Sequence, residues 1–164
     1  MKVEKRKILS TITESESETI RVGEKLSEFI ERGDVVALFG PLASGKTVLI
    51  RGICKGLGVD EIITSPTFTI IHEYSGIYPV YHFDCFRIEG EIDIKSICFD
   101  DYLSLDGVII IEWADRIESF LPTSSRFDIL LNHVEGYENH RRIEIFSYKP
   151  DIKFQLEKEG RVYH

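Results

Sequence analysis

The chain has 164 residues, a formal net charge of −8, 43% hydrophobic residues and 29% charged residues. These values are ordinary for one soluble globular domain, while the negative charge argues against a surface that clamps nucleic acid unaided. Because no apolar run of about eighteen residues is present and no signal-peptide core follows Met1, we expect a cytoplasmic protein with no membrane contact.

The first third of the chain predicts two strands and two helices. A strand is expected at 7–12, and the capping box Ser15–Glu18 starts a helix that runs to about Arg32. The apolar run at 35–39 is typical of a buried parallel strand, and 47–57 is typical of a helix.

The remaining elements are expected to be mainly strands. They are a segment at 62–71 that becomes strand-like after Pro66, through Phe68, Ile70 and Ile71, and a strand at 78–87. A helix at 89–103, a strand at 108–111, and strands at 127–134 and 141–148 follow. The first two strands of this set are expected to form a hairpin across Ser75–Gly76, and the last two across 135–139. The cysteines Cys54, Cys85 and Cys98 lack C-x-x-C spacing, so we expect reduced, buried thiols.

A phosphate-binding motif lies between the strand at 35–39 and the helix at 47–57. Residues Gly40–Thr47 read GPLASGKT and fit G-x-x-x-x-G-K-[ST], in which glycines allow backbone N–H groups to surround phosphate oxygens. The lysine reaches the β- and γ-phosphates, and the hydroxyl of the last residue holds Mg²⁺. The residues expected to contact the nucleotide here are Gly40, Leu42, Ala43, Ser44, Gly45, Lys46, Thr47 and Val48.

The motif and the element order together predict an α/β fold. We expect a P-loop NTPase core with a mixed, mostly parallel sheet, flanking helices and inserted antiparallel hairpins. Residues 1–150 are expected to form this single domain, and 151–164 a polar, mobile tail.

Hydrolysis also requires an acidic group near Mg²⁺ and a group that positions the attacking water. Two carboxylates follow apolar strands, Asp84 after Val80–Phe83 and Glu112 after Val108–Ile111. The alternative interpretation for each is a solvated acid at the end of a strand.

Three later motifs resemble one family. Ser65-Pro-Thr-Phe-Thr69, Tyr81-His-Phe-Asp-Cys-Phe-Arg87 and Glu112-Trp113 follow the phosphate loop in the order seen in the TsaE (YjeE) family of small bacterial ATPases. The resemblance covers roughly residues 15 to 135. It implies ATP hydrolysis in the complex that forms N6-threonylcarbamoyladenosine at tRNA position 37. The implied partners are two sugar-kinase-like subunits of the TsaB and TsaD types, and tRNA is reached only through them.

The resemblance also implies site residues. ATP and Mg²⁺ are the implied cofactors, with Lys46, Asp84 and Glu112 catalytic and with Thr47 and Glu112 on the metal. Trp113 is implied to lie beside the nucleotide, and Thr67, with Thr69, in a loop similar to a GTPase switch. Whether Asp84 orients water or hydrogen-bonds to a metal ligand stays open.

Two departures from the family pattern affect the site. Pro41 offers no N–H to a phosphate, and Cys85-Phe86 replaces the commoner apolar-Tyr pair, which removes a hydroxyl.

Several other residues have two interpretations. His82 either points away from a core face or belongs to the site; Arg87 either forms a structural salt bridge, which we favour, or neutralises phosphate charge. Trp113 either packs in the core or contacts nucleotide, and His133 and His140 are expected on the surface.

Two other functions fit a phosphate loop. A small-molecule kinase would need a basic lid, but Lys95 is the only basic residue between Ile88 and Val108. A GTPase-like binding switch would be expected to carry an N-K-x-D segment, which this sequence lacks.

Overall fold

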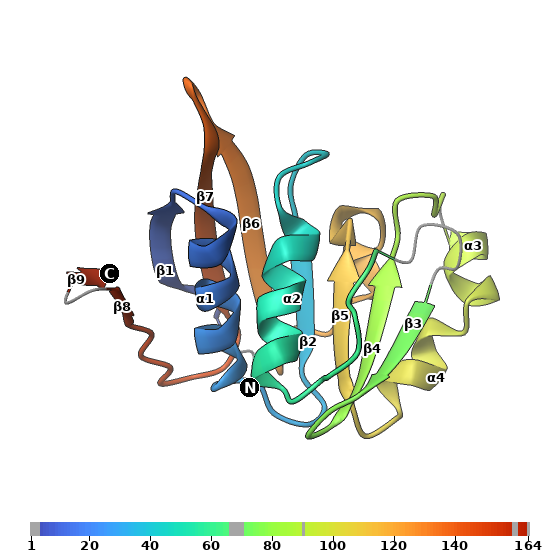
Figure 1. Ribbon diagram of the computed structural model, residues 1–164. Helices are drawn as coiled ribbons and strands as arrows, with labels where there is room; N and C mark the ends of the chain where they lie inside the picture. The colour runs from blue at the N-terminus through green and yellow to red at the C-terminus, as the bar shows by residue number, and fades with distance from the viewer. Residues whose placement is uncertain (1–3, 66–70, 90, 159–160, 164) are drawn as a thin grey trace.

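A seven-stranded sheet forms the middle of the molecule. The computed structural model describes residues 4–65, 71–89, 91–158 and 161–163. The sheet has the order β1-β7-β6-β2-β5-β4-β3, and Figure 1 shows it edge to edge. The strands are β1 Arg6–Thr13, β2 Val35–Phe39, β3 Ile71–Ser75, β4 Pro79–Asp84, β5 Val108–Glu112, β6 Arg126–Val134 and β7 Tyr137–Ser147.

The four central strands β6, β2, β5 and β4 are parallel to one another, and the antiparallel pairs lie on either side of them. β7 pairs antiparallel with β6 and with β1, and β3 pairs antiparallel with β4. The predicted α/β fold, with a mixed sheet and antiparallel hairpins, is therefore confirmed. β2 and β5 are the most apolar strands and lie in the interior because both of their faces are covered.

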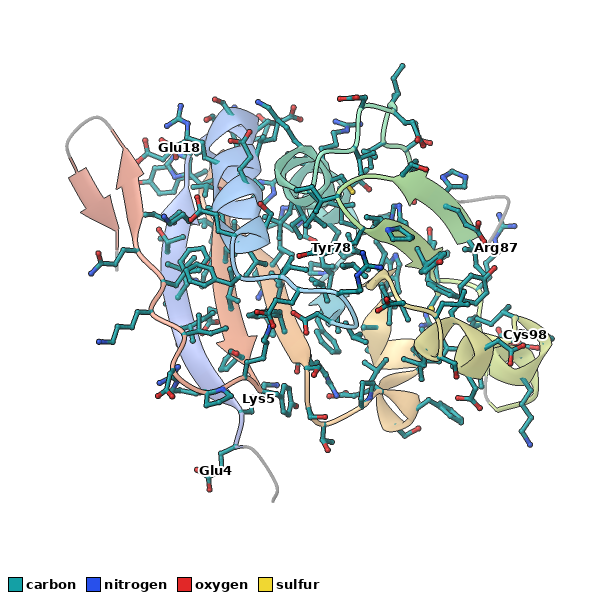
Figure 2. All side chains as sticks on the ribbon, turned by 90° about the horizontal axis from the view of Figure 1, so that it is seen from below. Glu4, Lys5, Glu18, Tyr78, Arg87 and Cys98 are labelled. Atoms are coloured by element: carbon teal, nitrogen blue, oxygen red, sulfur yellow. The ribbon has the colours of Figure 1, made fainter. Side chains whose placement is uncertain are left out.

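Helices cover both faces of this sheet, as Figure 2 shows from below. The helices are α1 Glu16–Ser27, α2 Lys46–Gly56, α3 Glu91–Ser96 and α4 Phe99–Leu103, with short 3₁₀ turns at Ala114–Arg116 and Glu118–Phe120. Alternate residues of β2 divide between two cores. Val36 and Leu38 face the α1 and α2 layer, whereas Val35 and Ala37 face the layer that contains α4 and the 3₁₀ turns.

α1 and α2 lie side by side because each presents a glycine to the other. A Cβ placed on Gly23 would lie 2.5 Å from the carbonyl oxygen of Leu49, and one on Gly52 would overlap the carbonyl of Ile20. This backbone contact fixes α2, and hence the phosphate loop at its N-terminus, against the first helix of the chain.

α1 begins where the capping box predicts, with Ser15 Oγ accepting a hydrogen bond from Glu18 N at 3.2 Å. Glu18 Oε2 in turn accepts a hydrogen bond from Glu14 N, the residue before the cap. α1 also ends earlier than predicted, at Ser27, since Glu28 to Ile30 make tighter i→i−3 bonds that turn the chain toward β2.

Two further predictions need correction. The helix predicted at 89–103 divides into α3 and α4, because Cys98 adopts a left-handed conformation with φ 56° that lets both Ile94 and Phe99 reach the core. Of the residues predicted to be strand-like after Pro66, Ile71 lies in β3, and residues 66–70 lie outside the described residues. Cys54 and Cys85 are buried as expected, but Cys98 is exposed.

The segment after residue 150 continues to contact the domain. Phe154 is buried and its ring centroid lies 5.6 Å from that of Phe29, and Leu156 is also buried. Leu156–Lys158 and Arg161–Tyr163 form the separate two-stranded sheet β8–β9. The domain boundary at 150 and a mobile tail stay predictions. In the part of the chain that the structure describes, no helix is long and apolar enough to cross a membrane.

Candidate nucleotide site

The carboxyl ends of the central parallel strands form one edge of the sheet, and the predicted site lies there. The β2–α2 connection carries the phosphate loop, seen at the top of Figure 1. Glu112 ends β5, and its pairing with Leu38 of β2 and Asp84 of β4 places both acids beside this loop. A pocket of about 740 Å³ opens at this edge.

The phosphate loop leaves the start of α2 open to an anion. Gly45 precedes the helix with φ 97°, a left-handed conformation that suits glycine, and no side chain caps the helix. The N–H groups of Lys46, Thr47 and Val48 therefore lack partners within the helix, as the first N–H groups of any helix do. Together with the helix dipole, these donors make a binding place for phosphate.

Lys46 lies inside the loop. Its Nζ donates hydrogen bonds to the carbonyl oxygens of Gly40 and Pro41, both at 2.8 Å, and lies 4.0 Å from the ring centroid of Trp113. Burial lowers the pKa of Lys46 from its ordinary 10.5, although Glu112 and other nearby carboxylates favour the charged form. A buried ammonium group that donates to carbonyl oxygens and lies over an aromatic ring is suited to bind an anion.

Glu112 is buried and accepts hydrogen bonds at both oxygens. Thr47 Oγ1 donates to Oε1 at 3.1 Å, while His82 Nε2 lies 2.8 Å and Ser65 Oγ 3.2 Å from Oε2. Burial acts to raise the pKa of Glu112, but the hydrogen bonds from His82, Thr47 and Ser65 lower it overall below its ordinary 4.5. This carboxylate is therefore charged at neutral pH.

Asp84 is joined to Glu112 through Ser65, whose Oγ lies 3.0 Å from Asp84 Oδ2. The other oxygen of Asp84 accepts from the Phe86 N–H at 2.9 Å, which fixes the carboxylate at the end of β4. Asp84 is only half-buried and lines the pocket, so one side of this carboxylate faces the pocket contents.

The oxygen atoms gathered here fit the predicted magnesium ion. Hydroxyl and carboxylate oxygens of Thr47, Glu112 and Asp84 are the hard donors that Mg²⁺ prefers, and Ser65 links the two acids. Among the described residues, no group of three or more His, Cys, Asp or Glu side chains could hold a metal ion alone. Phosphate and water oxygens would therefore complete the coordination, as is usual for Mg²⁺.

Most predicted site residues come together in this pocket. Its predicted members are Leu42, Ala43, Ser44, Gly45, Lys46, Thr47, Val48, Asp84, Glu112 and Trp113. Gly40 contributes its carbonyl to Lys46 instead of lining the pocket, and Thr67 and Thr69 lie outside the described residues. The half-buried ring of Trp113 packs on the core, as one of its two interpretations predicts, and also faces Lys46. Its contact with a nucleotide stays a prediction.

The other ambiguous residues separate clearly. His82 is fully buried and its Nε2 lies 2.8 Å from Glu112 Oε2, so of its two interpretations the structure favours the one that places it at the site. Arg87 is exposed and lies at the β3–β4 side of the molecule in Figure 2; within the described residues it makes no ion pair and does not line the pocket. His133 is exposed as expected, and His140 is half-buried, with its ring stacked on Tyr137 at 4.6 Å.

Eight of the residues that line the pocket were not predicted from the sequence as site residues. These residues are Glu14, Ser15, Glu16, Thr19, Ser65, Phe86, Asn139 and Arg141. Only Ser65 and Phe86 carried a signal, because they belong to the two motifs that bracket the site. The other six residues lie at the pocket because α1 packs on α2 and because β7 lies beside the phosphate loop.

An α/β sheet whose central strand leads through this loop into an uncapped helix is the arrangement of the P-loop NTPase fold. The family model of "Threonylcarbamoyl adenosine biosynthesis protein TsaE" matches residues 13–143. The chain therefore belongs to the TsaE family.

Individual relatives agree. The tRNA threonylcarbamoyladenosine biosynthesis protein TsaE of Bacillus subtilis (strain 168) is 41% identical over 111 residues, which cover 67% of this chain and 69% of the relative. The protein of the same name from Nostoc sp. (strain PCC 7120) is 37% identical over 139 residues, 82% of this chain and 83% of the relative. The crystal structure of Bacillus subtilis YdiB superposes with a TM-score of 0.72 at 32% identity, covering 90% and 88% of the two chains.

Proposed function

We propose that this chain binds ATP with Mg²⁺, hydrolyses it to ADP and phosphate, and by doing so serves the formation of threonylcarbamoyladenosine in tRNA. The observation that carries the proposal is the common pocket of Lys46, the uncapped start of α2 and the Thr47–Glu112 pair. The names of the relatives, which place those proteins in the biosynthesis of this modified nucleoside, supply the biological role.

Each residue of the pocket has a defined task in this proposal. Lys46 exchanges the carbonyls of Gly40 and Pro41 for the β- and γ-phosphates, and the first turn of α2 donates its N–H groups to them. Thr47 and Glu112 would hold Mg²⁺ through their oxygen atoms. When bound, Mg²⁺ neutralises charge that develops on the phosphate oxygens. Asp84, at the pocket wall, orients the water that attacks the γ-phosphorus atom.

The proposal places the reaction in a cytoplasmic assembly. The partners are the two sugar-kinase-like subunits of the TsaB and TsaD types, which hold the tRNA, and no membrane takes part. The net charge of −8 supports contact with proteins instead of bare tRNA. We expect slow hydrolysis by the isolated chain and faster hydrolysis with the partners, because phosphate-loop enzymes commonly gain a stabilising group in trans.

Phosphate release with and without the two partner proteins tests this function. The wild type, Lys46→Ala and Lys55→Ala are compared, because Lys55 is an exposed lysine on the same helix, outside the pocket. Release that the partners stimulate, and that only Lys46→Ala abolishes, is the expected result. Transfer of phosphate to a metabolite, or indifference to the partners, would instead favour a small-molecule kinase.

A further inference from the structure

The β6–β7 hairpin makes two hydrogen bonds to backbone carbonyl groups of the phosphate loop, at Leu42 and Ala43. His133 Nε2 lies 3.2 Å from the Leu42 carbonyl oxygen, and Arg141 NH2 donates to the Ala43 carbonyl oxygen at 3.3 Å. Since a carbonyl oxygen only accepts, Nε2 of His133 must carry the hydrogen. Figure 1 shows the hairpin extending beyond the other strands at the same end of the sheet as the β2–α2 connection.

These bonds act on the part of the loop with the least favourable backbone. Ala43 has φ 60°, a left-handed conformation that residues with a Cβ atom avoid. In a planar trans peptide the N–H points opposite to the preceding C=O. Holding the Leu42 carbonyl against the hairpin therefore turns the Ala43 N–H away from the hairpin, and holding the Ala43 carbonyl stabilises the strained residue itself.

Arg141 is well fixed for this task. Its NH1 donates to the carbonyl oxygens of Glu138 at 2.8 Å and His140 at 2.7 Å, so the hairpin backbone orients the guanidinium. The side chain then passes over the loop, because a Cβ placed on Gly45 would lie 3.9 Å from both Cγ and Nε of Arg141. Arg141 also lines the nucleotide pocket, to which it brings a permanent positive charge.

We propose that Arg141, assisted by His133, is a positioning residue that holds the phosphate loop in its anion-binding shape. The β6–β7 hairpin thereby sets the affinity of the site for the polyphosphate of a nucleotide. The proposal rests on the proposed nucleotide binding. A planar guanidinium that joins three carbonyl groups cannot be replaced by the single ammonium group of lysine, so the effect depends on shape as well as charge.

Calorimetric titration of ATP with Mg²⁺ measures the dissociation constant of wild type, Arg141→Ala, Arg141→Lys and His133→Ala. Arg142→Ala is the matched control, since Arg142 is the next residue of β7, is exposed and does not line the pocket. We expect the dissociation constant to rise about tenfold in Arg141→Ala, to stay at least about fivefold raised in Arg141→Lys, to rise less in His133→Ala and to be unchanged in Arg142→Ala.

Hydrogen exchange of the segment 40–47 without nucleotide supplies the second readout. Exchange is expected to become faster in Arg141→Ala than in Arg142→Ala, with the exchange of β2 and β5 unchanged. Equal dissociation constants for these two variants, or full recovery in Arg141→Lys, would overturn the proposal. If the wild type bound no ATP, the proposed function would fail, and the exchange of 40–47 would still decide whether Arg141 holds the loop. Should Arg141→Ala not fold, His133→Ala carries both readouts.

Discussion

Glu112 is the residue on which the site converges. Its two oxygens accept from side chains on three different segments: Thr47 at the start of α2, Ser65 before β3 and His82 on β4. His82 is fully buried, and its Nδ1 has no hydrogen-bond partner among the described residues. The bond to Glu112 is therefore the main polar contact of His82, and it fixes one oxygen of the carboxylate while leaving Thr47 on the other.

Replacing His82 tests this arrangement. His82→Ala leaves a buried carboxylate with a missing donor, so we expect the free energy of unfolding to fall by about 2–4 kcal/mol at neutral pH. Urea unfolding measures the change, with His72→Ala on the neighbouring strand as the control. The pKa of Glu112 is lowered in the folded state, so its stabilising contribution is present above 4.5 and is lost as pH falls through the lower folded-state value. The free energies of unfolding of wild type and His82→Ala should therefore approach each other as pH falls below 4.5. A difference that stays constant with pH would contradict the bond between His82 and Glu112.

The cysteines provide a second prediction at this scale. Burial raises the pKa of Cys54 and of Cys85 to about 12, whereas Cys98 is exposed at the outer end of the α3–α4 layer, as Figure 2 shows. Because only the thiolate reacts, a thiol reagent at about pH 8 should modify one cysteine quickly in the folded protein and all three in denaturant. Cys98→Ser should remove the fast reaction. Rapid modification of two or more thiols in the folded protein would contradict the burial of Cys54 and Cys85.

At the scale of elements, the site depends on how α2 is held. Its N-terminus carries the phosphate-binding donors, and its middle is fixed by the close contact of Gly52 with the backbone of Ile20 on α1. A helix displaced along this contact would move Lys46 and Thr47 together relative to Glu112 on β5. The packing of two helices therefore supports a site that neither helix forms alone.

A methyl group at this contact should disturb both stability and binding. In Gly52→Ala the added Cβ overlaps the Ile20 carbonyl, a backbone atom that cannot rotate away, so we expect a loss of about 1–3 kcal/mol from overpacking. Urea unfolding gives this value, and Lys55→Ala, on the exposed side of α2, should change it by less than about 1 kcal/mol. A Gly52→Ala protein as stable as the wild type would mean that the helices lie further apart.

At the scale of the whole molecule, buried titratable groups determine how the stability of the fold changes at high pH. Burial keeps the thiols of Cys54 and Cys85 protonated in the folded state, with pKa values of about 12 against 9.0 ordinarily. Hydrogen bonds to Asp34 and Glu31 outweigh burial and raise the pKa of Lys149. Each raised pKa contributes stability that is complete below the unfolded value and is lost as pH rises through the folded value.

We therefore expect the melting temperature to fall progressively as pH rises above about 9. The net charge of −8 adds repulsion in the same direction. Scanning calorimetry over this range measures the decline, and the double variant Cys54→Ala, Cys85→Ala should show a shallower one. An unchanged melting temperature up to pH of about 11 would contradict the account of these buried groups.

The sequence predicts those features that neighbouring residues encode, and it does not predict those that depend on contacts between distant segments. The phosphate loop and its flanking strand and helix are encoded within Val35–Gly56, so their form followed from the sequence. The early end of α1 and the break at Cys98 depend on which side chains the core accepts, and no local residue pattern indicates either. A strand pattern likewise gives the alternation of side chains between the two faces but not the residues that they contact, which is why both interpretations of His82 stayed open.

The same limit explains the residues of the site that were missed. Asp84 and Glu112 were found because both end apolar strands, and parallel strands end at one edge of a sheet. Arg141 lies about a hundred positions from the phosphate loop, and only the order β7-β6-β2 brings it there. Its own neighbourhood in the sequence, a strand with two arginines, gives no indication of which one faces the pocket.

Equilibrium dialysis of labelled ATP in the presence of Mg²⁺ tests the central claim, that this pocket is a nucleotide site with Lys46 at its centre. Wild type and Lys55→Ala are expected to retain one ATP per chain. Lys46→Ala should bind at least about tenfold more weakly, because it loses the charge-assisted hydrogen bonds to phosphate. Equal affinity in Lys46→Ala, or no ATP retained by the wild type, would contradict the claim.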